Sequence, residues 1–136
     1  MNEQQEVDPD TLDCVNGVFF LNGQPFTGMG LQRYSDGSKR DEVPFLDGRE
    51  HGVARSWYRD GRLAGETTYV RGVKHGPRRE WFENGLLRSE ELFEFDLVMR
   101  KEVRNDHQEV IENYECPTSA PIYRRIIEQR NAGGPE

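Results

Sequence analysis

Residues 46–69 read LDGREHGVARSWYRDGRLAGETTY and residues 70–93 read VRGVKHGPRREWFENGLLRSEELF, so one pattern recurs with a period of 24 residues. Positions 24 apart carry like residues: Gly28, Gly52 and Gly76; Tyr34, Tyr58 and Phe82; Trp57 and Trp81. A fixed period of this length indicates one supersecondary unit copied along an array. Such arrays form extended surfaces, which favours a binding protein over an enzyme.

Each copy is predicted to form two strands around a two-residue turn. The turn dipeptides Asp36-Gly37, Asp60-Gly61 and Asn84-Gly85 are of the kind that supplies two positive φ angles. Further glycine turns, at Asp47-Gly48 and Arg71-Gly72, link one hairpin to the next. We therefore expect a mainly β fold, a curved single-layer antiparallel meander. Its repeats would cover residues 22–45, 46–69 and 70–93, with a degenerate copy over 94–116.

The repeat domain, residues 14–116, is expected to lie between two different end segments. Residues 1–13 contain five acidic residues and no basic one, and we expect them to be flexible. In residues 117–136, Thr118 or Ser119 can cap a short helix that runs through Arg130. The helix has an apolar stripe that includes Ile126, so we expect it to cover part of the sheet, with a frayed tail beyond it.

Strand alternation assigns the side chains to two faces of the sheet. One face is predicted to carry an aromatic ladder that forms the core: Tyr34, Phe45, Tyr58, Tyr69, Phe82 and Phe93. Glycines such as Gly52 would leave room for these rings. On the other face Arg55 would oppose Glu66 and Trp57 would oppose Ala64.

This second face is the candidate binding surface, because Trp and Arg are the residues that most often anchor protein interfaces. The candidate residues are Arg33, Arg55, Trp57, Glu66, Arg79, Trp81, Arg88 and Glu90. Arg88 is expected to lie over the Trp81 ring as a cation–π contact. An ordinary solvated face that tolerates two tryptophans is the open alternative.

Composition disfavours several classes of partner. The net charge is −7 and the chain has no basic stripe, so we expect neither nucleic acid nor an anionic membrane as a partner. The first residues do not resemble a secretory signal, and the default expectation is a cytoplasmic protein. Cys14 and Cys116 are then expected to be free thiols.

No catalytic constellation is visible in the sequence, and we expect a protein that is not an enzyme and needs no cofactor. His51 and His75 occupy the same repeat position. Equivalent positions in adjacent hairpins lie two strands apart, ~9.6 Å, which is too far for both to reach one metal ion. We interpret them as turn residues, and His107 as part of a solvated loop.

The repeat resembles the MORN repeat, and more closely its variant in small bacterial antitoxin and immunity proteins. The third copy carries the resemblance through Gly72, Gly76, Trp81-Phe82, Asn84-Gly85, Leu87, Glu90 and Phe93. Leu46 to Tyr69 matches nearly as well, whereas residues 22–45 match loosely, with Arg33 in place of the tryptophan and Lys39 in place of the leucine.

The resemblance implies two classes of function. The bacterial variant group implies a protein that binds a cognate toxin and blocks its active site. The eukaryotic MORN proteins imply a homo-oligomeric scaffold, in some cases at a membrane. Nearly neutral repeats between acidic ends favour the first class. The scaffold, with a homodimer, stays as the alternative, and binding to a lipid surface is a third and weaker class.

Overall fold

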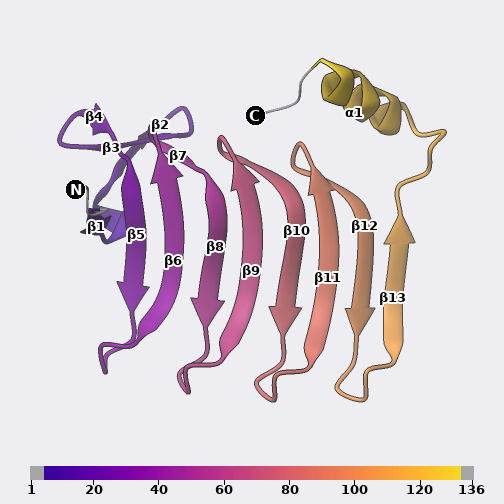
Figure 1. Ribbon diagram of the computed structural model, residues 1–136, viewed down its shortest axis with the longest axis horizontal. Coiled ribbons are helices and arrows are strands. Elements are labelled where there is room, and N and C mark those ends of the chain that lie inside the picture. Colours follow the sequence, from indigo (N-terminus) through magenta and orange to yellow (C-terminus); the bar gives the residue numbers. More distant parts are fainter. Residues whose placement is uncertain (1–4, 133–136) are drawn as a thin grey trace.

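The computed structural model describes residues 5–132, and its main feature is one open sheet of ten strands (Figure 1). These strands are β1 (Glu6–Val7), β5 (Gly28–Arg33), β6 (Lys39–Leu46), β7 (Arg49–Glu50), β8 (Gly52–Trp57), β9 (Leu63–Val70), β10 (Val73–Trp81), β11 (Leu87–Glu94), β12 (Leu97–Arg104) and β13 (Val110–Glu115). From β5 to β13 the order follows the sequence, with β7 attached to β6, and the pairs are antiparallel. The predicted mainly β meander with a C-terminal helix is therefore confirmed.

The turns inside the repeats differ from the prediction, and the linking turns have the geometry that was expected inside the repeats. At Asp60-Gly61 only the glycine has a positive φ, and the Tyr58 N–H bonds to the Arg62 carbonyl, which closes a three-residue loop. The same loop recurs at Gly37 and Gly85, whose φ angles are 91° and 90°. The linking turns, such as Asp47-Gly48 with φ angles of 49° and 83°, have both residues in the left-handed region that two-residue hairpins require.

The longer loop changes the predicted register near each turn. Trp57 pairs with Leu63, whereas the prediction paired it with Ala64. A bulge at Ala64 then restores the predicted register, and Arg55 pairs with Glu66 as expected. Bulges add one residue to a strand and redirect its neighbours, and the sequence pattern alone gave no sign of this one.

Tyrosine hydroxyls connect successive repeats. The Tyr34 hydroxyl donates to the Trp57 carbonyl, and the Tyr58 hydroxyl donates to the Trp81 carbonyl, each at 2.6 Å. Both bonds reach from one three-residue loop to the strand end of the next copy. Phe82 occupies the same position in the third copy and has no hydroxyl to donate. Side-chain bonds of this kind hold neighbouring hairpins at a fixed spacing.

The two repeated histidines also link hairpins. His51 Nδ1 accepts the Arg71 N–H at 3.1 Å, and His75 Nδ1 accepts the Phe95 N–H at 3.3 Å. We had predicted that the neighbouring glycines, Gly52 and Gly76, leave room for aromatic rings. In the structure they face other side chains, Pro44 and Thr68. A Cβ on Gly52 would meet Pro44 at 3.2 Å, and the glycine has a φ of 112°.

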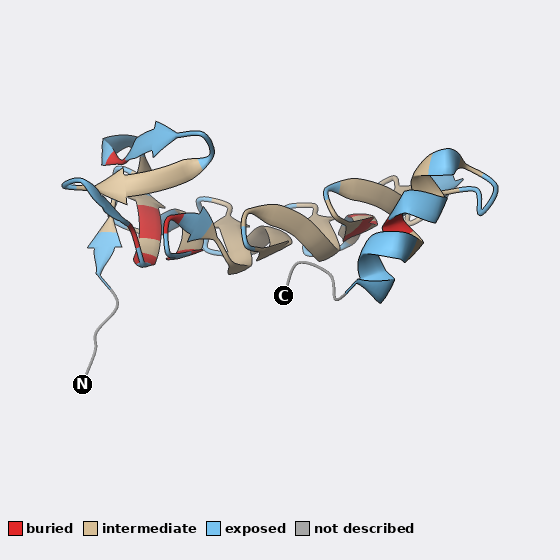
Figure 2. Cartoon of the chain, turned by 90° about the horizontal axis from the view of Figure 1, so that it is seen from above, coloured by how far each residue is buried: buried red, intermediate tan, exposed pale blue. Residues whose placement is uncertain are grey.

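Residues 5–13 are ordered where the sequence predicted flexibility, and residues 1–4 of that predicted segment lie outside the described residues. Within residues 1–13, β1 pairs in parallel with β5, and a 3₁₀ helix, η1 (Pro9–Thr11), follows it. A small second sheet is formed by β2 (Asp13–Val15), β3 (Val18–Leu21) and β4 (Gln24–Pro25). It stands on one side of the thin main sheet (Figure 2).

The main hydrophobic cluster lies under this small sheet. Leu12, Phe26 and Phe45 are buried together, and Phe19 meets Phe45 edge-on with ring centroids 5.2 Å apart. Phe45 and Phe93 of the predicted aromatic ladder are buried, whereas Tyr69 is only half-buried. The N-terminal segment therefore covers the ladder at its first repeat. The C-terminal helix had been expected to cover another part of the ladder, with the N-terminal segment as one of the candidates for the remainder.

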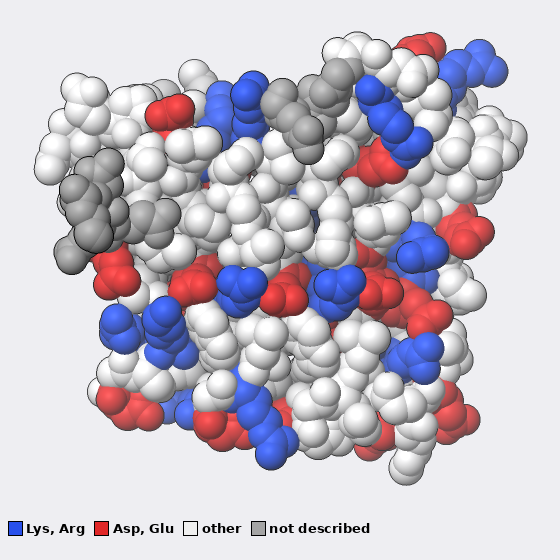
Figure 3. Space-filling view, in the orientation of Figure 1, with Lys and Arg blue, Asp and Glu red and all other residues white. Residues whose placement is uncertain are grey.

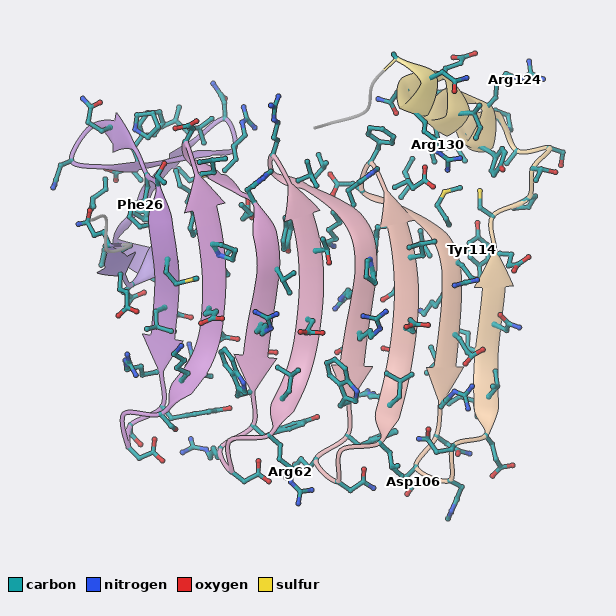
Figure 4. The ribbon with its side chains drawn as sticks, viewed as in Figure 1. Phe26, Arg62, Asp106, Tyr114, Arg124 and Arg130 are labelled. Carbon is teal, nitrogen blue, oxygen red and sulfur yellow. The ribbon has the colours of Figure 1, made fainter. Side chains whose placement is uncertain are left out.

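The helix α1 (Pro121–Asn131) lies beyond the ends of the strands, not on the sheet (Figure 1). Its contact with the strands is slight, although Ile126 is fully buried and Arg130 forms an ion pair with Glu94 at the end of β11 (Figure 4). The helix begins after Ala120, with Pro121 in its first turn, so the predicted hydroxyl caps at Thr118 or Ser119 are wrong. The predicted frayed tail, residues 133–136, lies outside the described residues.

Candidate protein-binding face

One face of the main sheet carries both tryptophans, and we call it the tryptophan face. A row of six charged residues crosses it at right angles to the strands, one each from β6 and β8–β12, and their signs alternate from Glu42 to Glu90. The row contains Glu42, Arg55, Glu66, Arg79, Glu90 and Glu102, which are Cα partners in that order. Figure 3 shows this band of alternating colours between two mostly uncharged zones.

The charges in this row pair with each other. Arg55 Nε lies 2.9 Å from Glu66 Oε2, and Arg55 Nη1 lies 3.8 Å from Glu42 Oε2. Arg79 Nε lies 2.6 Å from Glu90 Oε2. The side chains of Arg55 and Arg79 are 40% and 39% exposed, so each pair contributes only modestly to folding, ~0.2–1 kcal/mol. Their larger effect is to hold both guanidinium groups in fixed positions on the surface.

A second, largely apolar row lies beside the charged one, next to the three-residue loops. Trp57 pairs with Leu63, and Trp81 pairs with Leu87. Leu63 and Trp81 also line one shallow open hollow of about 430 Å³, together with the loop residue Arg62. Lys39 ends the row, with its Nζ 5.7 Å from the centre of the Trp57 ring.

The structure brings most of the predicted residues together. The two tryptophans and the pairs Arg55–Glu66 and Arg79–Glu90 lie in the two neighbouring rows. Arg33 is at the margin: it is exposed and donates to the Gly37 carbonyl in its own loop.

Arg88 differs from the prediction. It is the extra residue of the bulge between the Glu80–Ser89 and Trp81–Leu87 pairs. Its guanidinium carbon lies 5.8 Å from the centre of the Phe82 ring, so the expected stack on Trp81 is wrong.

Sequence reasoning missed two apolar members of the face. The predicted two-residue turns place Leu63 opposite Tyr58 and Leu87 opposite Phe82, on the face of the aromatic ladder. The three-residue loops move both leucines beside the tryptophans. The sequence carried no signal for this shift, because an Asp-Gly or Asn-Gly pair fits both loop lengths.

The described residues offer little for other chemistry. Within residues 5–132 no group of three His, Cys, Asp or Glu side chains is placed to hold a metal ion. No helix in the described part of the chain is long and apolar enough to cross a membrane. Burial raises the pKa of Tyr69, and the nearby Glu50 carboxylate raises it further. Cys14 and Cys116 are both free thiols in the structure.

Comparison with known proteins adds little. No protein-family model matches the chain, and no curated protein matches it. Among solved structures, the chain is similar to one chain of the crystal structure of the GtfA/B complex bound to UDP and GlcNAc, at 9% identity and a TM-score of 0.35. The match covers 95% of this chain and 30% of that chain. A likeness at this level carries no argument about function.

Proposed function

We propose that this chain is a non-enzymatic binding protein of the MORN-variant type, an antitoxin or immunity protein that neutralises a cognate toxin. The observation that carries the proposal is the apolar row Trp57–Leu63–Trp81–Leu87, half-exposed on an open sheet. Large apolar side chains that stay partly exposed in a row are typical of protein interfaces.

The neighbouring charged row supports a docking role. Arg55 and Arg79 are already held by Glu66 and Glu90 in the free protein, so less side-chain freedom is lost when a partner binds. Because these charges neutralise one another, the face exerts little long-range attraction. Binding would therefore depend mainly on burial of the apolar row and only weakly on salt.

The proposed mechanism is occlusion of the toxin's active site by the tryptophan face. In this account the partner is a protein toxin that acts in the cytoplasm, and the antitoxin contributes surface only, with no cofactor. The rigid, hydrogen-bonded hairpins would present the two tryptophans at a fixed separation, two strands apart, roughly 10 Å. A groove or rim on the toxin with two apolar anchors at that spacing would match the face.

The homo-oligomeric scaffold is the second candidate, and one observation favours it. The outer strand β13 is exposed along its whole length and leaves a sheet edge open. Pairing at that edge would leave the tryptophan face free. A dimer in solution would therefore be compatible with either function.

Affinity purification from the native organism tests the proposal. Tagged chain should recover one small protein in stoichiometric amount, and that protein should be toxic when expressed alone and harmless when co-expressed. Substituting Leu87 by lysine should abolish both recovery and protection, while a matched change at an exposed leucine far from the apolar row, Leu46→Lys at the opposite end of β6 from Lys39, should not. Recovery of only the chain itself, or full protection by the Leu87→Lys variant, would contradict the proposal.

A further inference from the structure

The last strand, β13, forms one edge of the main sheet, and the apolar side chains of the protein are unusually exposed there. All six of its residues are exposed, with Ile111 at 63%, Val110 at 47% and Tyr114 at 44%. Figure 4 labels Tyr114 on this outermost strand. A strand edge with uncovered apolar residues is a template for pairing with another strand.

The backbone groups that face outward from β13 follow from its pairing with β12. The Cys116 N–H donates to the Met99 carbonyl at 2.8 Å. Hydrogen-bonded and non-hydrogen-bonded pairs alternate along an antiparallel ladder, so Tyr114 and Glu112 also bond to β12. The N–H and C=O groups of Asn113 and Glu115 then point away from the sheet. These groups have the geometry of a ladder that lacks its partner strand.

The opposite edge of the sheet is covered. The short strand β1 pairs in parallel with β5, and the Met29 N–H donates to the Gln5 carbonyl at 2.8 Å. The ring of Pro9, in η1, lies close enough to Gly30 that an added Cβ would meet it at 2.9 Å. An array with two open edges would extend into a filament, whereas one open edge closes after a single pairing about a two-fold axis.

We propose that a second copy of this chain pairs with β13 in antiparallel fashion, with Asn113 on the two-fold axis. This register joins the outward-facing groups of the two Asn113 residues and places Glu112 opposite Tyr114 of the second copy. A register centred on Glu112 would instead oppose two carboxylates directly, which is unfavourable.

The charges near the edge permit this contact. Glu112 already forms an ion pair with Lys101 on β12, at 3.1 Å, and Arg100 is the Cα partner of Glu115. The acidic side chains of β13 therefore have basic neighbours within their own sheet, and two such edges can approach without strong repulsion.

The proposed dimer has a consequence for the tryptophan face. A two-fold axis perpendicular to the sheet continues each face of one copy into the same face of the other. Both apolar rows would then lie on one side of a single continuous sheet. The dimer does not depend on the toxin-binding proposal, but if both hold, the complex contains two copies of each partner.

Solution mass tests the dimer, with a proline variant as the specific probe. Asn113→Pro removes the outward-facing N–H and leaves the β12 bonds intact, because proline is tolerated on a strand edge. Asn113→Thr keeps that N–H and serves as the matched control. Sedimentation equilibrium over a concentration series should give a dimer for the native chain and the threonine variant, and a monomer for the proline variant. A native monomer at all concentrations, or a dimeric proline variant, would overturn the proposal.

Disulfide trapping tests the register and does not depend on how the proline variant folds. In a background with Cys14 and Cys116 changed to serine, Asn113→Cys places two thiols across the axis, with Cα atoms about 5.5 Å apart. That distance permits a disulfide. Glu112→Cys places its pair roughly 8 Å apart, from two residues of offset along the strand and one strand spacing across it. Oxidation should crosslink the first variant and not the second; equal crosslinking, or none in either, would overturn the register.

Discussion

The hydroxyl of Tyr58 is predicted to stabilise the array by joining its second and third repeats. It donates to the Trp81 carbonyl at 2.6 Å, a short distance for an O–H···O bond between two partly buried groups. Tyr58→Phe keeps the ring and removes only the donor. One such bond contributes ~0.5–1.5 kcal/mol, and the half-exposed position of Trp81 allows water to replace part of it.

Urea unfolding followed by circular dichroism measures this loss. With an m-value of about 1–3 kcal/mol/M, a loss of about 1 kcal/mol lowers the midpoint by roughly 0.3–1 M. Tyr69→Phe is the matched control, because the Tyr69 hydroxyl makes no hydrogen bond to the part of the chain that the structure describes. That control should stay within about 0.5 kcal/mol of the native chain.

The equivalent bond from Tyr34 extends the test to additivity. The two hydroxyls lie in different repeats with no shared partner, so the double variant should lose the sum of the two single losses within about 0.5 kcal/mol. If Tyr58→Phe unfolds at the same urea concentration as the native chain, or if Tyr69→Phe costs as much, the hydroxyl bonds do not hold the repeats together.

Three further predictions concern packing, charge and pH. Gly48→Ala should lower the free energy of unfolding by more than about 2 kcal/mol, because its Cβ would lie 2.5 Å from Val18 at a φ of 83°. Gly61→Ala has open space around it and should cost about 1 kcal/mol, and the urea midpoints of the two variants compare these losses. Arg79→Gln should lose ~0.2–1 kcal/mol in low salt and less in 1 M salt, measured the same way. Burial raises the folded-state pKa of Tyr69 above 10.0, so stability that is fully present below pH 10 is lost as the pH rises through that pKa. Thermal melts over an alkaline pH series should therefore show a smaller loss of stability for Tyr69→Phe than for the native chain.

The period of the sequence was sufficient to predict the meander, because turn glycines and aromatic residues recur at positions that only a hairpin array explains. It was not sufficient to predict the turn type. An Asp-Gly pair fits both a two-residue loop and a three-residue loop, and the choice depends on how the following bulge fits the next strand. That single residue decides whether Leu63 faces the aromatic ladder or Trp57.

The ends of the chain were harder to predict than its middle. The acidic composition of residues 1–13 suggested a solvated segment, although Leu12 belongs to the buried cluster around Phe45 and Val7 packs against that cluster. The amphipathic stripe of α1 predicted a buried face, and Ile126 is indeed buried. The stripe could not show that the first repeat would already be covered by the small sheet, because that contact joins segments with no shared pattern.

The candidate face was predicted correctly where the strands are regular and incorrectly at a bulge. Arg55, Glu66, Arg79 and Glu90 lie in the regular part of the strands, where alternation assigns faces correctly. Arg88 lies at a bulge, where alternation fails, and its side chain reaches Phe82.

The apolar row is the central element of the proposed interface, and the binding constant of the double variant Trp57→Ala/Trp81→Ala for the co-purified partner tests its role. Isothermal titration with the native chain and a Leu46→Ala control provides the reference. We expect at least a hundredfold weaker binding for the double variant, about 2.7 kcal/mol, with an unchanged sheet spectrum and an unaffected control. Native affinity in a folded double variant would show that the partner binds elsewhere and that the apolar row is not the interface.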